Sequence, residues 1–275
     1  MTGARTPAAA GKTRFDDIYD RPDPRAYFRT LAPLRYEIPQ QAQDVFRRTL
    51  ALRSAVPGTR LPVTVLDLCC SYGINAALLN HDLTLADLYA HYTGDETAAL
   101  TRGELVEADK EFYAARRRPD AVPVIGLDMA ADATRYALEV GLLDEAYAEN
   151  LERHPPSDGL RRAMARVGLI TVTGGIGYIT HRTFDALLDA AGIPVWVSAF
   201  VLRTVPFEQI LATLEAHGLA TETDPGRTYP QRLFTGPDEQ SGAVDDVRAA
   251  GDDPTGLEAA GRYYARLYQA RPRPA

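Results

Sequence analysis

The chain has 275 residues, of which 45% are hydrophobic and 24% charged, so it can bury a sizeable core and is not disordered as a whole. Its formal net charge of −7 argues against nonspecific binding of nucleic acid or anionic lipid, which requires a basic surface. The sequence has no apolar run of about 18 residues that would indicate a membrane helix. Its only cysteines, Cys69 and Cys70, are adjacent and predict neither a disulfide nor a metal site. We therefore expect a reduced, cytoplasmic protein.

The N-terminal part of the chain is expected to cover the rest. Residues 1–14 have the composition of a disordered leader and lack the apolar segment of a secretory signal. Prolines at 22, 24, 33 and 39 exclude one long helix, so short helices are expected over a cap at 15–58.

Apolar and helical segments alternate through the middle of the chain. Five segments have the length and β-branching of buried strands: Val63–Leu68, Val122–Leu127, Glu145–Glu149, Val167–Thr173 and Val195–Leu202. Helical patterns separate most of them: Ile74–Asn80, Ala130–Val140 and His181–Ala190, with Pro206–Ala216 after the fifth. This alternation predicts an α/β fold with a mostly parallel, Rossmann-like sheet and helices on both faces.

The predicted domain at 59–240 also contains an edge hairpin and a helical insertion, and a C-terminal part follows it. Leu219–Asp224 and Gln231–Thr235, joined by a turn-rich stretch, predict an antiparallel hairpin at the sheet edge, which brings the sheet to seven strands. Residues 84–118 form a helical insertion with two amphipathic patterns. Residues 241–275 are expected to form an acidic linker and a docking helix with Leu257, Tyr264 and Leu267 inward.

The stretch VTVLDLCCSYGINAALLN, residues 63–80, has the order strand, tight turn, helix, which is where many α/β proteins bind a nucleotide-like cofactor. The turn carries Cys69, Ser71 and Tyr72, with Gly73 as its one glycine. Cysteine and serine can replace glycine if the backbone φ angle is negative at their positions. Two interpretations stay open: a tolerant cofactor loop, or a loop no longer shaped for a cofactor.

The element order and several motifs resemble the class I S-adenosylmethionine-dependent methyltransferases. VLDLCCSYG is similar to the family's first motif, in which Asp67 matches the acid and Gly73 the last glycine. GLDMAADATRYALEVGLLDEAYAENLE is similar to the next motifs. The resemblance covers roughly 19–235 and is most specific at 63–80 and 124–151. It implies the Rossmann-like fold and S-adenosylmethionine as cofactor.

The resemblance also implies roles for individual residues. Those of the first loop, Asp67, Cys69, Ser71 and Gly73, would face the amino-acid end of the cofactor. Asp128 would accept hydrogen bonds from the ribose hydroxyls, because it ends the second strand. Met129 would lie against the adenine, and Asn150, next to Glu149, would contact its edge. Asp67 and Asp128 could instead serve as ordinary helix caps.

Candidate catalytic residues come from two regions. The stretch TGGIGYITHRTF follows the fourth strand, and Tyr178 and His181 in it can reach a pocket, with His181 as a general base or, alternatively, a helix cap. Tyr19 is the third candidate. It belongs to a group of tyrosines at 19, 27 and 36, with Asp20 and Arg25, that forms either a lid over a cationic ligand or a cover of the sheet edge.

Four further residues are candidates for contact with a substrate: Tyr27, Tyr72, Gly175 and Arg203. Arg203 follows the fifth strand and could hold an anionic group or form a surface salt bridge.

Three hypotheses follow for the function. The first is a small-molecule methyltransferase of specialised metabolism, the natural-product pathways. The second is a repurposed enzyme of the same fold that performs a cyclisation or elimination without the cofactor, for example closing an aziridine by displacing sulfate with an amine. The third is a scaffold subunit of a biosynthetic complex. A small molecule is the expected ligand, and a homodimer or a small accessory protein stays open as a partner.

Overall fold

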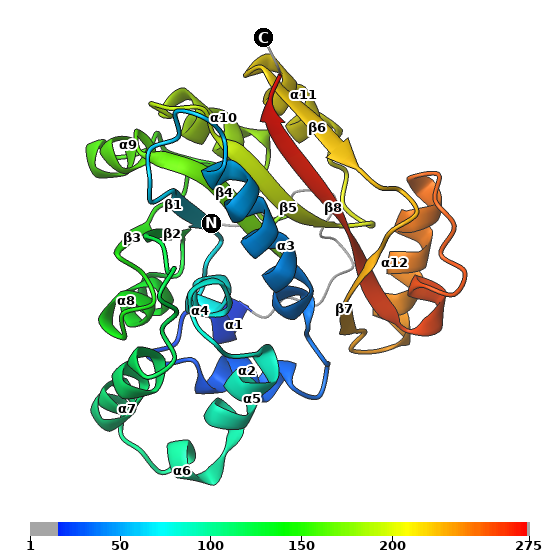
Figure 1. Ribbon diagram of the computed structural model, residues 1–275. Coiled ribbons are helices and arrows are strands. Elements are labelled where there is room, and N and C mark those ends of the chain that lie inside the picture. Colours follow the sequence, from blue (N-terminus) through cyan, green and yellow to red (C-terminus); the bar gives the residue numbers. More distant parts are fainter. Residues whose placement is uncertain (1–15, 274–275) are drawn as a thin grey trace.

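The computed structural model describes residues 16–273, so the leader predicted at 1–14 lies outside the described residues. One mixed sheet runs through the molecule (Figure 1). Its strands are β1 (Thr64–Leu68), β2 (Val124–Asp128), β3 (Glu145–Ala148), β4 (Val167–Thr173), β5 (Trp196–Leu202), β6 (Leu219–Thr223), β7 (Tyr229–Leu233) and β8 (Arg262–Pro272). The strand order is β3-β2-β1-β4-β5-β8-β6, and β7 also pairs with β8.

The parallel half of the sheet, from β3 to β5, confirms the predicted Rossmann-like fold. In the register, Asp67 of β1 lies between Gly126 of β2 and Thr171 of β4. Because parallel strands all end at the same edge, the chain turns that follow β1, β2 and β4 meet there.

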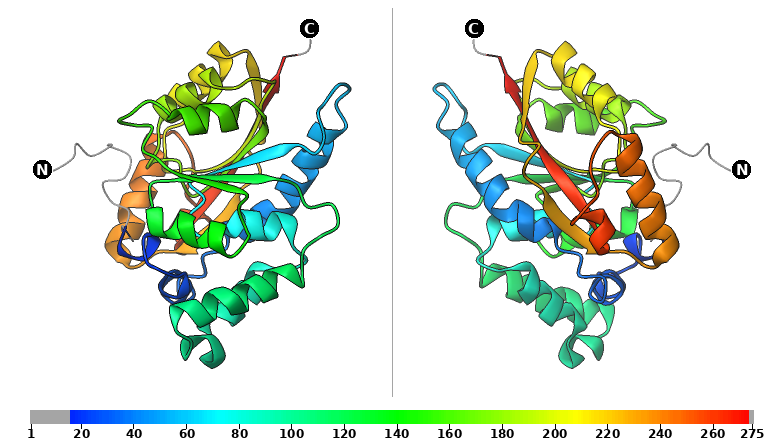
Figure 2. Two further views of the ribbon diagram at one scale, coloured as in Figure 1. Left: turned by 90° about the vertical axis from the view of Figure 1, so that its left-hand side faces the viewer. Right: turned by 90° about the vertical axis from the view of Figure 1, so that its right-hand side faces the viewer.

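Helices cover both faces of the sheet, as the alternating pattern predicts (Figure 2). One face packs against α3 (Ile38–Ser54), α4 (Ile74–Asn80) and α8 (Ala131–Glu139), and the other against α9 (Asp158–Met164), α10 (His181–Asp189) and α11 (Glu208–Ala216). Between them, β1, β2, β4 and β5 are almost wholly buried, and all seven residues of β4 are. The continuous apolar runs of β1 and β4 therefore reflect burial on both sides.

The helical insertion lies outside the sheet layers, beyond the short helices α1 (Asp16–Tyr19) and α2 (Arg25–Leu31) (Figure 1). It contains α5 (Leu85–Thr93), α6 (Asp95–Ala98) and α7 (Arg102–Ala114). Thr84 and Thr101 begin α5 and α7 with reciprocal capping boxes. The fully buried Asp109 of α7 accepts hydrogen bonds from Tyr92 of α5 and Tyr136 of α8, which fixes the insertion to the main domain.

The prediction for 241–275 was wrong in its main feature. Residues 262–272, expected as part of a docking helix, form β8, which pairs antiparallel with both β5 and β6. The three tyrosines of this stretch suit a strand, and the open edges of β5 and β6 offer backbone partners that outweigh its helical spacing. The predicted acidic linker is largely helix α12 (Pro237–Ala249), followed by a short 3₁₀ turn at Glu258–Ala260.

The predicted antiparallel edge of the sheet is present, but its strands pair differently from the predicted hairpin. β6 and β7 do not pair with each other; β6 pairs with the second half of β8 and β7 with its first half. The turn-rich link between them lies opposite the middle of β8, because Thr223 at the end of β6 faces Tyr268 and Tyr229 at the start of β7 faces Ala265. The 11 residues of β8 are enough to receive a partner strand at each end. Among the described residues, none of the helices is long and apolar enough to cross a bilayer.

Candidate functional site

A cavity of about 440 Å³ opens at the carboxyl ends of β1, β2 and β4. This volume is within the usual range of small-molecule sites, about 300–1,000 Å³. Nine of the residues predicted for the site line it: Tyr19, Tyr27, Cys69, Ser71, Asp128, Met129, Asn150, Gly175 and Tyr178. The carboxyl edge of the sheet thus brings together side chains from the N-terminal cap and from four loops.

The β1–α4 loop has the backbone of a glycine loop although only one glycine is in it. Cys69, Ser71 and Gly73 have φ angles of 59°, 48° and 75°, all in the left-handed region. The condition under which cysteine and serine would replace glycine without strain, a negative φ angle, is therefore not met at Cys69 or Ser71. For residues with a side chain, this conformation costs about 1–2 kcal/mol each. Two non-glycine residues in such a conformation indicate that the loop shape itself is required.

Hydrogen bonds from β2 hold the loop in this shape. The Cys69 N–H donates to the Leu127 carbonyl at 2.8 Å, and the Ser71 N–H donates to Asp128 Oδ2 at 2.9 Å. Inside the loop, the Gly73 N–H donates to the Cys70 carbonyl at 2.8 Å. The strain at positions 69 and 71 is thus held by contacts with the neighbouring strand.

Cys69 occupies space that a side chain at position 175 would need. A Cβ atom added to Gly175 would lie 2.6 Å from the Cys69 sulfur and 2.7 Å from its Cβ, far inside van der Waals contact. Glycine after β4 is therefore matched to cysteine after β1. This pairing lets the loop carry a side chain without closing the cavity.

This match predicts a strong coupling between positions 69 and 175. In the wild-type background Gly175→Ala should lower the free energy of unfolding by about 1–3 kcal/mol, as overpacking does. In a Cys69→Gly background the same change should cost less than about 1 kcal/mol, since the sulfur is gone. Urea unfolding of the four proteins of this cycle measures both costs. Equal costs in the two backgrounds would contradict the pairing.

Asp67 lies directly behind the loop and is 1% exposed. Its Oδ1 accepts a hydrogen bond from the Asn75 side chain at 2.9 Å, while its Oδ2 has no partner among the described residues. Burial raises the pKa of this carboxyl to about 7. Asp67 does not itself line the cavity; Asn75, which it holds, does.

Asp128 lies in the cavity wall with both oxygens in use. In addition to the bond from Ser71, its Oδ1 accepts from the Ala130 N–H at 3.0 Å. Burial raises the pKa of Asp128, although the backbone N–H groups partly oppose this. Each oxygen keeps a further lone pair for a ligand. Asp128 therefore orders the loop and can still accept hydrogen bonds from a ligand. The alternative role as a helix cap would explain its contact with Ala130 but not its contact with Ser71.

The loop after β3 adds two more carboxylates to the wall. Glu149 accepts hydrogen bonds from the Ser157 N–H and hydroxyl at 2.9 and 2.6 Å. Glu152 accepts hydrogen bonds from Thr180 and Thr183, which ties this loop to the start of α10. Asn150, between them, turns its side-chain oxygen to the Glu152 N–H.

Tyrosines from two regions form the opposite wall. Tyr27 packs edge-on against Tyr19 and Tyr36, with ring centroids 5.6 and 6.3 Å apart. Tyr178, 39% exposed, comes from the β4–α10 loop. Burial raises the pKa of Tyr19, Tyr27 and Tyr36, so these phenols stay protonated at neutral pH. They can donate hydrogen bonds but are poor bases.

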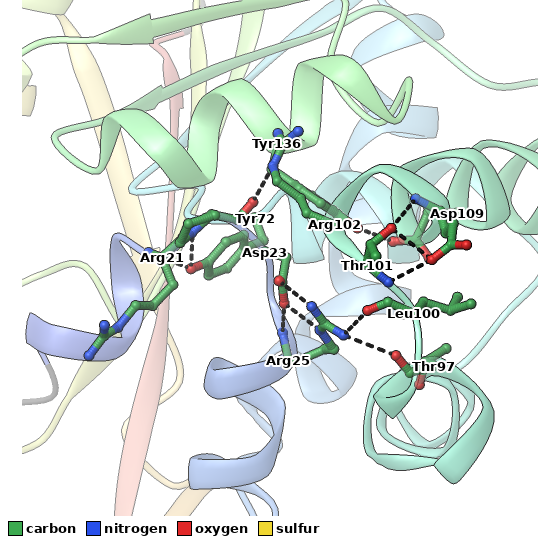
Figure 3. A network of polar contacts seen from close by, with 12 residues as sticks. Arg21, Asp23, Arg25, Tyr72, Thr97, Leu100, Thr101, Arg102, Asp109 and Tyr136 are labelled. Carbon is green, nitrogen blue, oxygen red and sulfur yellow. Dashed lines mark hydrogen bonds and ion pairs between the residues drawn. The ribbon is translucent and has the colours of Figure 1, made fainter.

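Tyr72 was expected to contact substrate, and the structure places it elsewhere. Its ring is buried away from the cavity, and its hydroxyl accepts from the Arg21 N–H at 2.9 Å and contacts the Ile18 carbonyl at 3.1 Å (Figure 3). Nearby, Arg25 bonds Asp23 and the carbonyls of the α6–α7 turn. Tyr72 therefore anchors the N-terminal segment, which brings Tyr19 and Tyr27 to the site.

Three other predicted residues do not line the cavity either. The buried Arg203 pairs with Glu258 at 2.6 Å, because the 3₁₀ turn before β8 covers it, so it is not available to an anionic substrate. His181 is the first residue of α10. The N-cap of this helix is not His181 but Thr180, whose side chain accepts a hydrogen bond from the Arg182 N–H. Gly73 also lies outside the lining and shapes the loop through its backbone.

Sequence reasoning missed three polar residues of the site: Asn75, Glu152 and Thr173. Asn75 and Thr173 bond each other across the β1–β4 boundary at 3.1 Å. A polar residue in the otherwise apolar first turn of α4 was the available signal for Asn75. Glu152 carried none, since its partners Thr180 and Thr183 are about 30 positions away in the chain.

No family model matches the chain, and no curated protein matches it in sequence. It is similar to the solved structure of the YcgJ protein from Bacillus subtilis at 12% identity, with 83% of this chain and 99% of that chain covered and a TM-score of 0.44. It is also similar to the CurJ carbon methyltransferase at 10% identity, with 84% of this chain and 54% of that chain covered and a TM-score of 0.45. A third similar structure is the [4+2]-cyclase SpnF, at 15% identity, with 86% of this chain and 83% of that chain covered and a TM-score of 0.41. Likeness at this level assigns no activity to the chain.

Proposed function

We propose that the protein is an S-adenosylmethionine-dependent methyltransferase that acts on a small molecule of specialised metabolism. The observation that carries the proposal is the run of left-handed φ angles at Cys69, Ser71 and Gly73. This backbone keeps the concave shape of a glycine-rich cofactor loop at the end of β1, although two glycines are absent.

The residues around the cavity fit this cofactor. Ser71 Oγ is buried with no partner among the described residues, and Asp128 keeps lone pairs free. The loop would hold the amino-acid end of the cofactor and Asp128 its ribose, with Met129 and Asn150 beside the adenine. When bound, the cofactor supplies an electrophilic methyl group.

The chain itself would contribute mainly by positioning. The tyrosine wall excludes water from the tightly packed side of the cavity, and its protonated phenols orient an acceptor by donating hydrogen bonds. No histidine, lysine or arginine of the described residues lines the cavity, so His181 is not proposed as its base. Methyl transfer needs only alignment if the acceptor already has a free lone pair.

One observation favours a second candidate, a cofactor-independent enzyme of the same fold. The side chains of Cys69 and Ser71 line the cavity at positions where the family's loop is bare. They reduce the room for a cofactor and add polar groups toward a substrate. In that enzyme the carboxylates would bind an amino substrate directly.

Calorimetric titration with S-adenosylmethionine and S-adenosylhomocysteine separates the two candidates. We expect both to bind with micromolar dissociation constants and to compete for one site. Replacing Glu111, an exposed residue of α7 outside the cavity, with glutamine provides a control that should bind both equally well. Absence of binding by either ligand to the folded protein would overturn the methyltransferase proposal and favour the second candidate.

A further inference from the structure

The cavity wall carries charge of one sign only. Four carboxylates line it, those of Asp20, Asp128, Glu149 and Glu152, and among the described residues no lysine, arginine or histidine does. A ligand site with this composition attracts cations and repels anions. We propose that the second ligand of this site, the methyl acceptor, is a molecule that carries an ammonium group, which binds to this wall, and a separate atom with a free lone pair, which takes the methyl group. This inference rests on the proposed function, because only methyl transfer makes the second ligand an acceptor.

The carboxylates are not neutralised by neighbouring cations. Asp20 Oδ1 accepts from the Asp132 N–H at 2.7 Å, Glu149 is bonded by Ser157, and Glu152 by Thr180 and Thr183. All of these donors are uncharged, and no ion pair joins any of the four acids to a basic side chain of the described residues. A hydrogen bond from a neutral donor brings no positive charge that would offset a carboxylate.

The cofactor alone does not balance this charge. S-adenosylmethionine carries a sulfonium, an ammonium and a carboxylate, a net charge of about +1 at neutral pH. With the cofactor bound, the wall would still hold a formal charge of about −3. A neutral or anionic acceptor would leave that charge unbalanced in a half-enclosed site, whereas an ammonium ion reduces it.

The tyrosine wall supports the same ligand class. Tyr19, Tyr27, Tyr36 and Tyr178 all line the cavity, and their ring faces attract cations through the π quadrupole. The edge-on packing of Tyr27 against Tyr19 and Tyr36 holds these rings in differing planes around one region. Aromatic faces next to uncompensated carboxylates make up the surroundings in which proteins bind substituted ammonium groups.

A matched pair of probes tests the inference without any turnover. Phenethylamine is an ammonium ion at neutral pH, and 2-phenylethanol is a neutral molecule of nearly the same shape. Calorimetric or NMR titration in the presence of S-adenosylhomocysteine should show the amine binding at least about 10-fold more tightly, with the preference falling as salt rises. Equal affinity for the two probes would overturn the inference.

Two variants assign the preference to this wall. Asp20→Asn keeps the hydrogen bond to Asp132 and removes one charge, so it should reduce the amine preference by about 3-fold or more. Tyr19→Leu should reduce it as well, whereas Tyr19→Phe should keep it. Glu111→Gln, with the same charge change on the exposed surface, should leave it unaltered. An equal effect of Asp20→Asn and Glu111→Gln would contradict a role for the wall.

The outcomes also separate this inference from the proposed function. If both cofactor forms bind and the amine shows no preference, the methyltransferase proposal stands and the ammonium acceptor is rejected. If neither cofactor form binds and the amine preference persists without them, the cation site stands and methyl transfer is rejected.

Discussion

Replacing Asp67 with asparagine should raise the free energy of unfolding of the ligand-free protein at pH 8, by at most about 4 kcal/mol. Burial raises the pKa of Asp67 from 3.8 to about 7 in the folded state. The folded protein therefore binds a proton more tightly than the unfolded chain does. An asparagine side chain resembles the protonated carboxyl and does not ionise.

The sign of the pH dependence follows from this shift. The stabilisation by the protonated Asp67 is fully present below pH 4 and is lost as pH rises through about 7. The Asp67→Asn protein should lack this loss, so the two proteins should differ more at pH 8 than at pH 5. Urea unfolding at both pH values measures it, with Glu111→Gln as the control for a plain change of charge. A difference that is the same at pH 5 and pH 8 would exclude the raised pKa.

Asp128→Ala should abolish cofactor binding within the range that calorimetry detects, a loss of about 100-fold or more. The substitution removes the acceptor of the Ser71 and Ala130 N–H groups. Without that acceptor, nothing of comparable strength holds Ser71 at its positive φ angle, and the loop should relax. The free energy of unfolding should fall by about 2–3 kcal/mol, because two charge-assisted hydrogen bonds are lost.

Two further substitutions make this result specific. Asp128→Asn keeps one acceptor oxygen and should bind the cofactor at an intermediate level. Asp120→Ala removes an exposed carboxylate just before β2 and should bind like the wild type. Wild-type affinity in a folded Asp128→Ala protein would show that the loop does not need its anchor in β2.

The parallel half of the fold could be predicted from the sequence because burial on both faces leaves a clear pattern. β1 and β4 read as apolar runs, and the turn after each marks the edge where the cavity lies. β8 could not be predicted, since the spacing of Leu257, Tyr264 and Leu267, which starts ahead of the strand, fits a helix face. Only the two unpaired strand edges beside it decide in favour of a strand.

The candidate site was predicted in outline and missed in its details. A motif places Asp67 and Asp128 at neighbouring strand ends, which the register confirms. It does not reveal that Asp67 points behind the loop, nor that Tyr72 faces the N-terminal segment. The φ angles at Cys69 and Ser71 depend on contacts with β2, so the local sequence could not decide their sign.

The position of β8 has a consequence for the order of events during synthesis. Until residues near 272 have left the ribosome, β5 and β6 each present an unsatisfied edge, and Gln269 cannot reach its partner Thr49, 220 positions earlier. Nascent chains of intermediate length therefore expose edges prone to intermolecular pairing. Contacts this distant in the chain also slow folding, so the protein should depend on chaperones more than its helical content suggests.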